Sequence, residues 1–217
     1  MPRPRFHKLA ADKQSAILET ASKEFIQCGG YHATSYNKIM EKLGISKGAM
    51  YYYFEDKFDL FQTVAMSAFK TILDRFWQEK PNTESTEDFW ASNVQMYFNI
   101  FNQELFQSSE LALYSDIIKN RHSTGEYSKV FQVVYKEVEK FANYLMESGM
   151  KIGAVRTDCP LDLVTRQYLA NLITFESWYL IKIAKNNMTL EDYYNSQFKE
   201  DVQTQFKLIK CMLQPEK

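Results

Sequence analysis

The sequence predicts an all-α fold, in which a short N-terminal three-helix module precedes a helical bundle, with about nine helices in all. Only 7 Gly and 5 Pro occur in 217 residues. Few turns therefore interrupt the chain, whereas an all-β fold would need frequent turn signals. Apolar residues also recur at intervals of three and four along most of the chain, which is the period of a helix with one buried face.

Composition indicates a globular protein with a sizeable core, because 45% of the residues are hydrophobic and 15% are aromatic. The net charge is −1, yet residues 1–57 carry a small excess of Lys and Arg, as a polyanionic partner would require. No apolar signal segment follows the first basic residues, and the most apolar run, 168–184, is too short to span a membrane. We expect a cytoplasmic protein with no membrane partner. Its three cysteines, which form no CxxC pair, are expected to be reduced and mostly buried.

The first eleven residues are predicted to form a basic flexible arm. Pro2 and Pro4 disfavour an early helix, and Arg3, Arg5 and Lys8 supply positive charge. Such an arm can follow phosphates or enter a minor groove, and the alternative is a disordered, solvated tail.

A helix is expected over residues 12–28, ended by Gly29 and Gly30. Two short helices with a glycine turn between them follow within residues 33–57. Gly44 can adopt the left-handed backbone that ends the first of them. Hydroxyl residues that can cap a helix stand where each short helix would begin: Thr34, Ser35 and Ser46.

The second short helix has two different faces. Met50 and Phe54 share the apolar face, four residues apart. Small, basic and phenolic groups occupy the opposite side: Lys47, Gly48, Tyr51 and Tyr52. A helix of this kind fits a DNA major groove, so the stretch reads as a helix-turn-helix.

The succession of these motifs is specific. A helix and a glycine turn are followed by T-S-x-x-x-I, then L-G-I-S-K-G-A-M-Y-Y-Y-F, then D-K. This order resembles the DNA-binding domain of the TetR/AcrR family of bacterial transcriptional regulators, over about residues 10–61. The resemblance implies a helix-turn-helix DNA-binding domain at 1–56 and a helical regulatory and dimerisation domain at 57–217.

We assign a role in DNA binding to individual residues of this domain. Lys47 can reach a guanine edge or a phosphate, Gly48 allows close approach, and Lys57 lies at a helix start, where a phosphate can bind. For other residues of the predicted set, the alternative to a DNA contact is a role in packing or helix capping, or simple exposure to solvent. The predicted DNA-binding set is Thr34, Ser35, Tyr36, Lys38, Ser46, Lys47, Gly48, Tyr51, Tyr52, Tyr53 and Lys57.

The rest of the chain is expected to form helices at 57–80, 87–104, 108–121, 125–149, 161–185 and 190–213. In the family, a helix equivalent to the first of these joins the DNA-binding head to the regulatory body. The last two carry apolar faces too large for one monomer to cover, which usually marks an interface. Family members dimerise in this way, so we expect a homodimer through a four-helix contact.

Aromatic residues in the second part could line a small-molecule pocket or could belong to the core. Glu176 interrupts an apolar helix and could meet a cationic ligand, pair across the dimer or face water. The predicted ligand-binding set is Trp90, Tyr97, Phe98, Phe101, Tyr114, Phe175, Glu176 and Trp178.

No catalytic motif is found, and the three histidines are isolated, so no enzyme activity, metal site or cofactor is expected. The predicted function is that of a homodimeric repressor. It binds a near-palindromic double-stranded DNA operator and is released by an unidentified small-molecule effector. The alternatives are a transcriptional activator of the same fold, or a ligand-independent DNA-binding or interaction protein.

Overall fold

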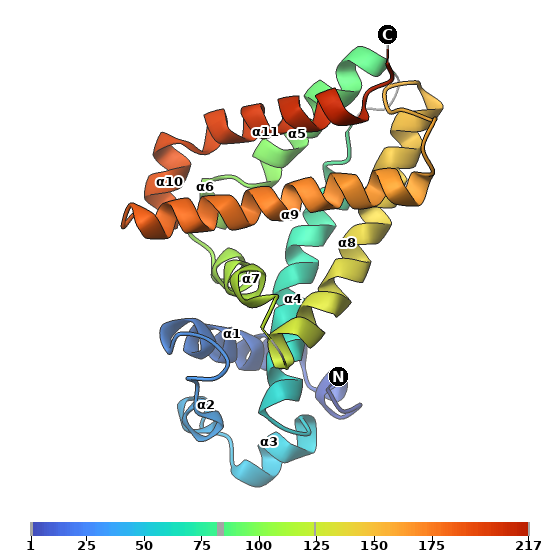
Figure 1. Ribbon diagram of the computed structural model, residues 1–217. Coiled ribbons are helices and arrows are strands. Elements are labelled where there is room, and N and C mark those ends of the chain that lie inside the picture. Colours follow the sequence, from blue (N-terminus) through green and yellow to red (C-terminus); the bar gives the residue numbers. More distant parts are fainter. Residues whose placement is uncertain (1, 82–84, 124, 217) are drawn as a thin grey trace. The chain divides into compact units, whose positions relative to one another are not determined.

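The computed structural model describes residues 2–81, 85–123 and 125–216 (Figure 1). Within these ranges the chain forms eleven α-helices, one short 3-10 helix and no strand, so the predicted all-α fold is confirmed. The helices pack as two compact units. The first comprises the chain up to Thr71 together with Ser108–Phe131, and the second comprises Ile72–Gln107 and the chain from Gln132 onward.

The helix bounds agree closely with the predicted ranges in the first unit and depart from them at two places in the second. The 3-10 helix is Phe6–Lys8. The α-helices are α1 Ala11–Gln27, α2 Tyr36–Leu43, α3 Lys47–Tyr53, α4 Lys57–Gln78, α5 Thr86–Ile100, α6 Gln103–Phe106, α7 Ser109–Asn120, α8 Glu126–Lys151, α9 Leu161–Lys185, α10 Leu190–Ser196 and α11 Phe198–Leu213.

The helix-turn-helix is formed by α2 and α3, and local signals fix its ends. The Ser35 side chain accepts a hydrogen bond from the Lys38 N–H at 3.5 Å, and the Ser46 side chain accepts one from the Ala49 N–H at 3.2 Å. Gly44 ends α2 with φ 61°, the left-handed conformation that favours glycine. Ile39 and Met50 are fully buried, so both helices are held by one apolar core.

The prediction of a flexible or disordered N-terminal arm is wrong for the residues around Phe6. This side chain is only 2% exposed, and its ring centroid lies 4.8 Å from that of Phe54. The Arg3 N–H donates to the Tyr53 carbonyl at 2.9 Å, and the Arg5 guanidinium lies 4.0 Å from the centre of the Tyr52 ring. Burial of one aromatic ring anchors the arm against the end of α3.

A hydrogen-bonded latch joins the loop before α2 to α7 and the start of α8. The Tyr31 N–H donates to the Tyr127 hydroxyl at 2.9 Å, and this hydroxyl donates to Asp116 at 2.6 Å. Gly30 has φ +102°, and a Cβ there would lie 2.4 Å from the Tyr127 oxygen. Together with the packing of α7 against α1, the latch ties the segment Ser108–Phe131 to the rest of the first unit.

Two helices expected as single elements are each divided, which raises the number from about nine to eleven. The segment 87–104 breaks after Ile100. The Asn102 side chain accepts a hydrogen bond from the Leu105 N–H at 3.0 Å and so caps the start of α6. The segment 190–213 breaks at Gln197, whose φ of −132° and ψ of −23° interrupt the helix. Clustered aromatic rings form the core of this second unit, with Tyr97 stacked on Phe101 at 4.4 Å and Phe198 4.9 Å from Phe106.

Three boundaries separate the compact units: one inside α4, one between α6 and α7, and one inside α8. The domain limits predicted from the sequence, 1–56 and 57–217, follow the helix-turn-helix motif rather than the packing, and they stay a prediction. Across the described ranges, none of the helices combines the length and the apolar character needed to cross a bilayer.

Candidate nucleic-acid interface

The outward face of α3 presents the residue types expected of a groove-reading helix. Ser46, Lys47 and Gly48 are exposed at its start. Tyr51 and Tyr52 keep 39% and 46% of their surface accessible, which is unusual for aromatic residues with a core nearby. The Lys47 ammonium lies 5.9 Å from the centre of the Tyr51 ring, so charge and phenol share one surface. Tyr53 is half-buried and contributes less to this face.

Gly48 is open to its surroundings on the same face. A Cβ built there meets no atom within 4 Å, and the backbone φ is not in the left-handed range. Neither packing nor backbone strain within the chain therefore requires glycine at this position. Gly44 is also open, but its positive φ gives a conformational reason for glycine.

The start of α2 adds a second group of residues beside α3. Ser35 and Lys38 are exposed, whereas Tyr36 is half-buried. The Tyr36 ring meets the Tyr51 ring edge-on, with centroids 5.7 Å apart. Its hydroxyl is buried and has no hydrogen-bond partner within the described part of the chain. Burial raises the pKa of this phenol, so it stays neutral and is a potential donor.

Lys38 has a partner inside the protein that the sequence did not indicate. Its ammonium lies 3.0 Å from a carboxylate oxygen of Glu24, and Lys42 contacts the other oxygen. Glu24 is buried, with 1% of its surface exposed. Hydrogen bonds from Lys42, and then from Lys38, lower the pKa of Glu24 to about 2. The three side chains form an ion-paired cluster that ties α1 to α2.

Thr34 and Lys57 point into the protein. Thr34 is 3% exposed, and its hydroxyl donates to the Gly30 carbonyl at 2.8 Å. The Lys57 ammonium donates to the carbonyls of Tyr31 and Thr34 at 2.8 and 3.0 Å. Partial burial lowers the pKa of Lys57. Both side chains hold the loop before α2, so only the exposed part of the predicted set is available for a candidate interface.

Arg5, which the sequence analysis assigned to a basic arm that can follow phosphates, lies beside α3. Its guanidinium covers the Tyr52 ring, and this places a cation next to the exposed tyrosines. The sequence feature that could have indicated this position of Arg5 is its neighbour Phe6, a single aromatic residue in an otherwise basic arm. A buried aromatic neighbour would have indicated that the arm is anchored.

The aromatic residues predicted to bind a ligand are distributed over both units, and their role in ligand binding stays a prediction. Tyr114 belongs to the first unit, where its ring lies 5.6 Å from that of Phe69. Trp178 is 46% exposed on α9. The Trp90 indole N–H donates to the Ala154 carbonyl at 3.1 Å, so its polar atom is already satisfied. Phe98 is half-buried and Phe175 is 5% exposed.

The second unit contains buried polar groups on α5 and α9. Glu176 is 5% exposed, so the proposal that it faces water is wrong for a single chain. Burial, and then the nearby Glu176, raise the pKa of Tyr97 well above its usual value. Within the described ranges, the hydroxyls of Tyr97 and Thr165 and the amide oxygen of Asn93 are buried without a hydrogen-bond partner. Such atoms are costly to leave unpaired and therefore need an explanation.

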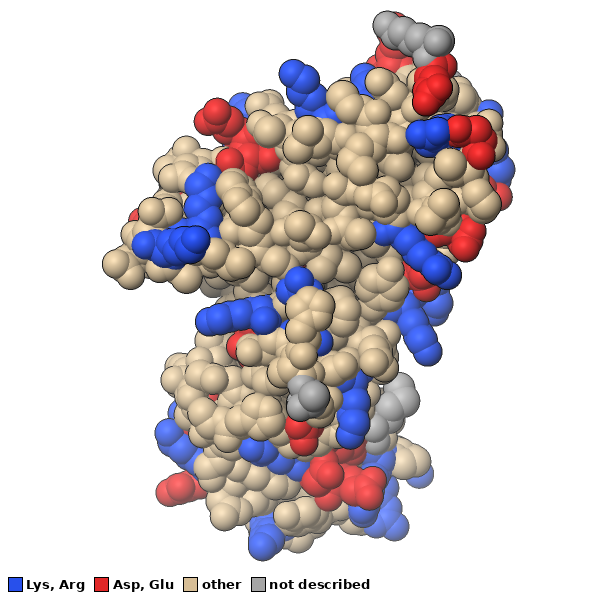
Figure 2. All heavy atoms as spheres, viewed as in Figure 1, with Lys and Arg blue, Asp and Glu red and all other residues tan. Residues whose placement is uncertain are grey.

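Exposed apolar side chains concentrate on α9 and α11. Ile181 and Leu208 each keep 55% of their surface exposed. A groove of about 340 Å³ runs between the two helices and is lined by residues that include Trp178 and Leu208. Figure 2 shows that the face over α9 and α11 is made mostly of uncharged residues. Such a surface is of the kind that a second protein chain covers.

The described parts of the chain contain neither a cluster of metal-binding side chains nor a disulfide. No three side chains of His, Cys, Asp or Glu converge there as a bound metal ion would require. The three cysteines are free. Cys28 and Cys159 are half-buried, but Cys211 is exposed, so the expectation of mostly buried thiols was too strong.

Comparison with known proteins places the helix-turn-helix in a family. Residues 17–64 match the family described as "Bacterial regulatory proteins, tetR family". The chain is 25% identical over 149 residues to YhgD of Bacillus subtilis, a helix-turn-helix transcriptional regulator, and the match covers 68% of this chain and 74% of that protein. It is also 25% identical over 119 residues to the transcriptional activator FasR of Mycolicibacterium smegmatis, which covers 50% and 54% of the two chains.

The fold of the whole chain resembles those of solved regulators. The structure of the transcriptional regulator FadR from Bacillus subtilis, in complex with stearoyl-CoA, superposes with a TM-score of 0.64 at 16% identity. It covers 89% of this chain and 95% of that one. At this level of identity the likeness concerns the fold.

Proposed function

Because the chain belongs to the TetR family of bacterial transcriptional regulators, we propose that it is a homodimeric repressor of a near-palindromic DNA operator. In this proposal it works in the cytoplasm, is not an enzyme, and is released from DNA by a small-molecule effector. The observation that carries the proposal is the exposed face of α3, where Lys47, an unobstructed Gly48 and Tyr51 lie together.

In the proposed complex α3 enters the major groove. Lys47 reaches a guanine edge or a phosphate, and Gly48 lets the backbone approach the bases. Tyr51 and Tyr52 contact phosphates. Ser35 and the first turn of α2 supply a second phosphate contact through a hydroxyl and free backbone N–H groups. Arg5, held over Tyr52, extends the positive surface beside them.

The proposed dimer forms through the apolar face of α9 and α11. Two such faces related by a two-fold axis would cover each other's exposed side chains in a four-helix contact. The dimer would then place two copies of α3 in successive major grooves, about 34–36 Å apart or a multiple of that distance. A near-palindromic operator matches this symmetry.

The proposed effector site lies in the second unit, around Tyr97. Support comes from the buried, unpartnered oxygens of Tyr97, Thr165 and Asn93, which a bound polar group could satisfy. The regulator FadR from Bacillus subtilis, whose fold this chain resembles, was solved in complex with stearoyl-CoA, which supports ligand binding by a chain of this fold. An effector acts only through its difference in affinity for the DNA-bound and free states. Activation, as in FasR, is the second candidate output and would use the same DNA contacts.

Salt-dependent DNA binding by the full chain tests the proposal. Duplexes selected from a random pool provide the operator, and affinity is measured at several salt concentrations. Loss of one phosphate contact should reduce the slope of log affinity against log salt by about 0.9. Lys47→Ala should weaken binding by about tenfold and change this slope or the preferred base at one position.

Lys119→Ala is the matched control, since Lys119 is an exposed lysine on α7, outside the helix-turn-helix. This variant should bind the selected duplex as the unaltered chain does. Equal affinity and equal salt slope for Lys47→Ala and the unaltered chain would remove α3 from the interface.

A further inference from the structure

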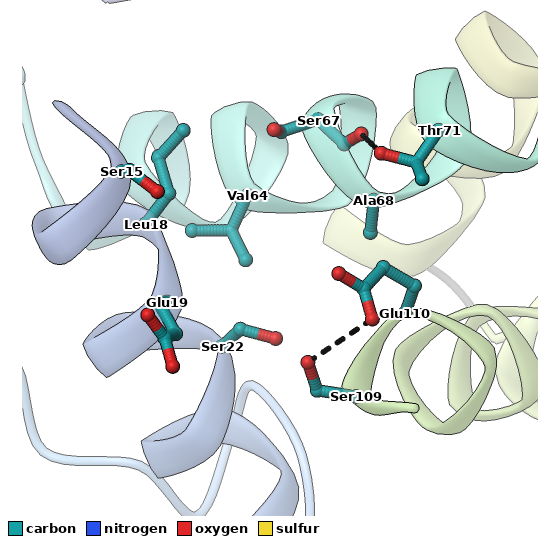
Figure 3. A pocket seen from close by; sticks show the side chains of 10 residues that line it. All are labelled: Ser15, Leu18, Glu19, Ser22, Val64, Ser67, Ala68, Thr71, Ser109 and Glu110. Atoms are coloured by element: carbon teal, nitrogen blue, oxygen red, sulfur yellow. Dashed lines mark hydrogen bonds between the residues drawn. The ribbon is translucent and has the colours of Figure 1, made fainter. Parts of the chain in front are cut away.

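The first unit contains a small polar cavity that none of the proposed DNA contacts uses. It has a volume of about 190 Å³ and lies between α1, α4 and α7 (Figure 3). Leu18, Val64 and Ala68 form its apolar part. Drug-sized ligands occupy pockets of roughly 300 Å³ or more, so this cavity suits a smaller molecule.

Hydroxyl groups and carboxylates supply the polar lining. Serine and threonine side chains come from all three helices: Ser15 and Ser22 from α1, Ser67 and Thr71 from α4, and Ser109 from α7. The two carboxylates are Glu19 and Glu110, and none of the described Lys or Arg residues lines the cavity. The lining therefore accepts hydrogen bonds and carries negative charge.

Two polar side chains in the cavity have few or no partners among the described residues. Ser22 is only 7% exposed, and no hydrogen bond to a described residue engages its hydroxyl, which points toward Ser109 in Figure 3. Glu110 is half-buried, and its carboxylate accepts one weak hydrogen bond, from the Ser109 hydroxyl at 3.3 Å. Glu19, in contrast, is already paired with Lys23 at 2.6 Å. The Glu110 carboxylate therefore stays available to a ligand cation, which would gain more from the pairing in a partly enclosed cavity than on an open surface.

We propose that this cavity binds a small organic ammonium ion, with its charge on Glu110 and its N–H groups donating to Glu110 and the serine hydroxyls. An ammonium group offers up to three donors, which matches the surrounding acceptors. The apolar part of the cavity would take a short hydrocarbon chain. A divalent metal ion fits less well, because the described residues offer no group of three metal-binding side chains.

The site differs from the proposed effector region, since all of its residues belong to the first unit. A ligand here would join α1, which buttresses the helix-turn-helix, to α4 and α7. Binding would therefore stabilise the unit that carries α3. The inference does not depend on the DNA-binding proposal, and it is tested without DNA.

Calorimetry and thermal unfolding of the full chain test the site, with putrescine as the probe. Its uncharged counterpart 1,4-butanediol and magnesium chloride serve as comparison ligands. Putrescine should bind saturably and raise the unfolding midpoint, whereas the diol and magnesium should not. Glu110→Gln should weaken putrescine binding by about tenfold or more, because it removes the charge and keeps the shape.

Glu104→Gln is the matched control, since Glu104 is an exposed glutamate of the second unit with a side chain 82% accessible. Ser22→Ala gives a second probe of the cavity with little risk to folding, and it should also weaken binding. Equal binding of putrescine and the diol, equal losses in Glu104→Gln and Glu110→Gln, or unchanged binding in both cavity variants would overturn the proposal. Selective binding of magnesium would also overturn it, because the cavity would then be a metal site.

Discussion

Replacing Gly48 with alanine separates the stability of the helix-turn-helix from its function. The added Cβ would meet no atom of the protein within 4 Å, and the backbone of Gly48 is helical. Alanine inside a helix is more stable than glycine by up to about 1 kcal/mol. Because position 48 lies in the first turn of α3, we expect about half of that gain.

The unfolding midpoint should therefore rise slightly, by about 1–2 °C for a chain of this size. Affinity for the selected duplex should fall, since the new methyl group stands where the helix backbone would meet the groove. A loss of about tenfold corresponds to about 1.4 kcal/mol of binding free energy. Thermal unfolding and fluorescence anisotropy with a labelled duplex measure the two effects on the same preparation.

Gly44→Ala is the comparison, because it adds the same atom into equally open space at φ +61°. The left-handed conformation should cost this variant about 1–2 kcal/mol of stability. A Gly48→Ala variant that binds DNA as tightly as the unaltered chain would refute the close approach of α3. A large loss of stability in this variant would refute the open environment of Gly48.

Three further predictions follow from contacts in the structure. Glu24→Gln should lower the free energy of unfolding at neutral pH by about 1–2 kcal/mol, after allowance for the partly exposed lysine partners. Because the pKa of Glu24 is about 2 in the folded chain, below its ordinary value of 4.5, this stabilisation is present above pH 4.5 and is lost as the pH falls toward 2. Urea unfolding of both chains between pH 7 and 3 checks this, and a difference independent of pH would contradict it. Lys57→Met keeps the side-chain stem but loses the hydrogen bonds to the loop before α2. It should lower the free energy of unfolding, measured in urea, by about 1–2 kcal/mol. An unchanged free energy of unfolding would contradict this structural role and favour the predicted DNA contact of Lys57. Leu208→Glu should convert the dimer into monomers in sedimentation experiments, whereas Val133→Glu, at an exposed apolar residue of α8, should not, and a dimer in both would exclude the α9 and α11 face.

The sequence was sufficient for the helix-turn-helix because its ends depend on neighbouring residues. Ser35, Gly44 and Ser46 act within one helical turn, and the structure places each of them in the predicted capping role. The break at Asn102 had a readable signal of the same kind, an asparagine three residues before Leu105. The break at Gln197 had none, since glutamine is an ordinary helix residue.

Side-chain roles were harder to predict where the partner is distant in the sequence. Lys38 and Lys57 look alike as surface cations, yet one pairs with Glu24 and the other with the loop before α2. Local patterns give no information about such partners. The same limit applies to the aromatic residues of the second unit, which have similar spacing whether they line a pocket or fill a core. Burial separates Tyr97 from Trp178, and periodicity does not.

The latch from Tyr31 through Tyr127 to Asp116 has a consequence for protein engineering. Chimaeras that exchange DNA specificity between regulators are naturally spliced in a loop after the helix-turn-helix. In this chain such a splice would separate the two halves of the latch, because its partners lie on segments about 100 residues apart. A recipient should therefore receive two pieces, the chain up to Thr71 and the segment Ser108–Phe131. Two of the three junctions then fall inside α4 and α8, where the helices of donor and recipient must match in phase, and the third falls in the short loop between α6 and α7.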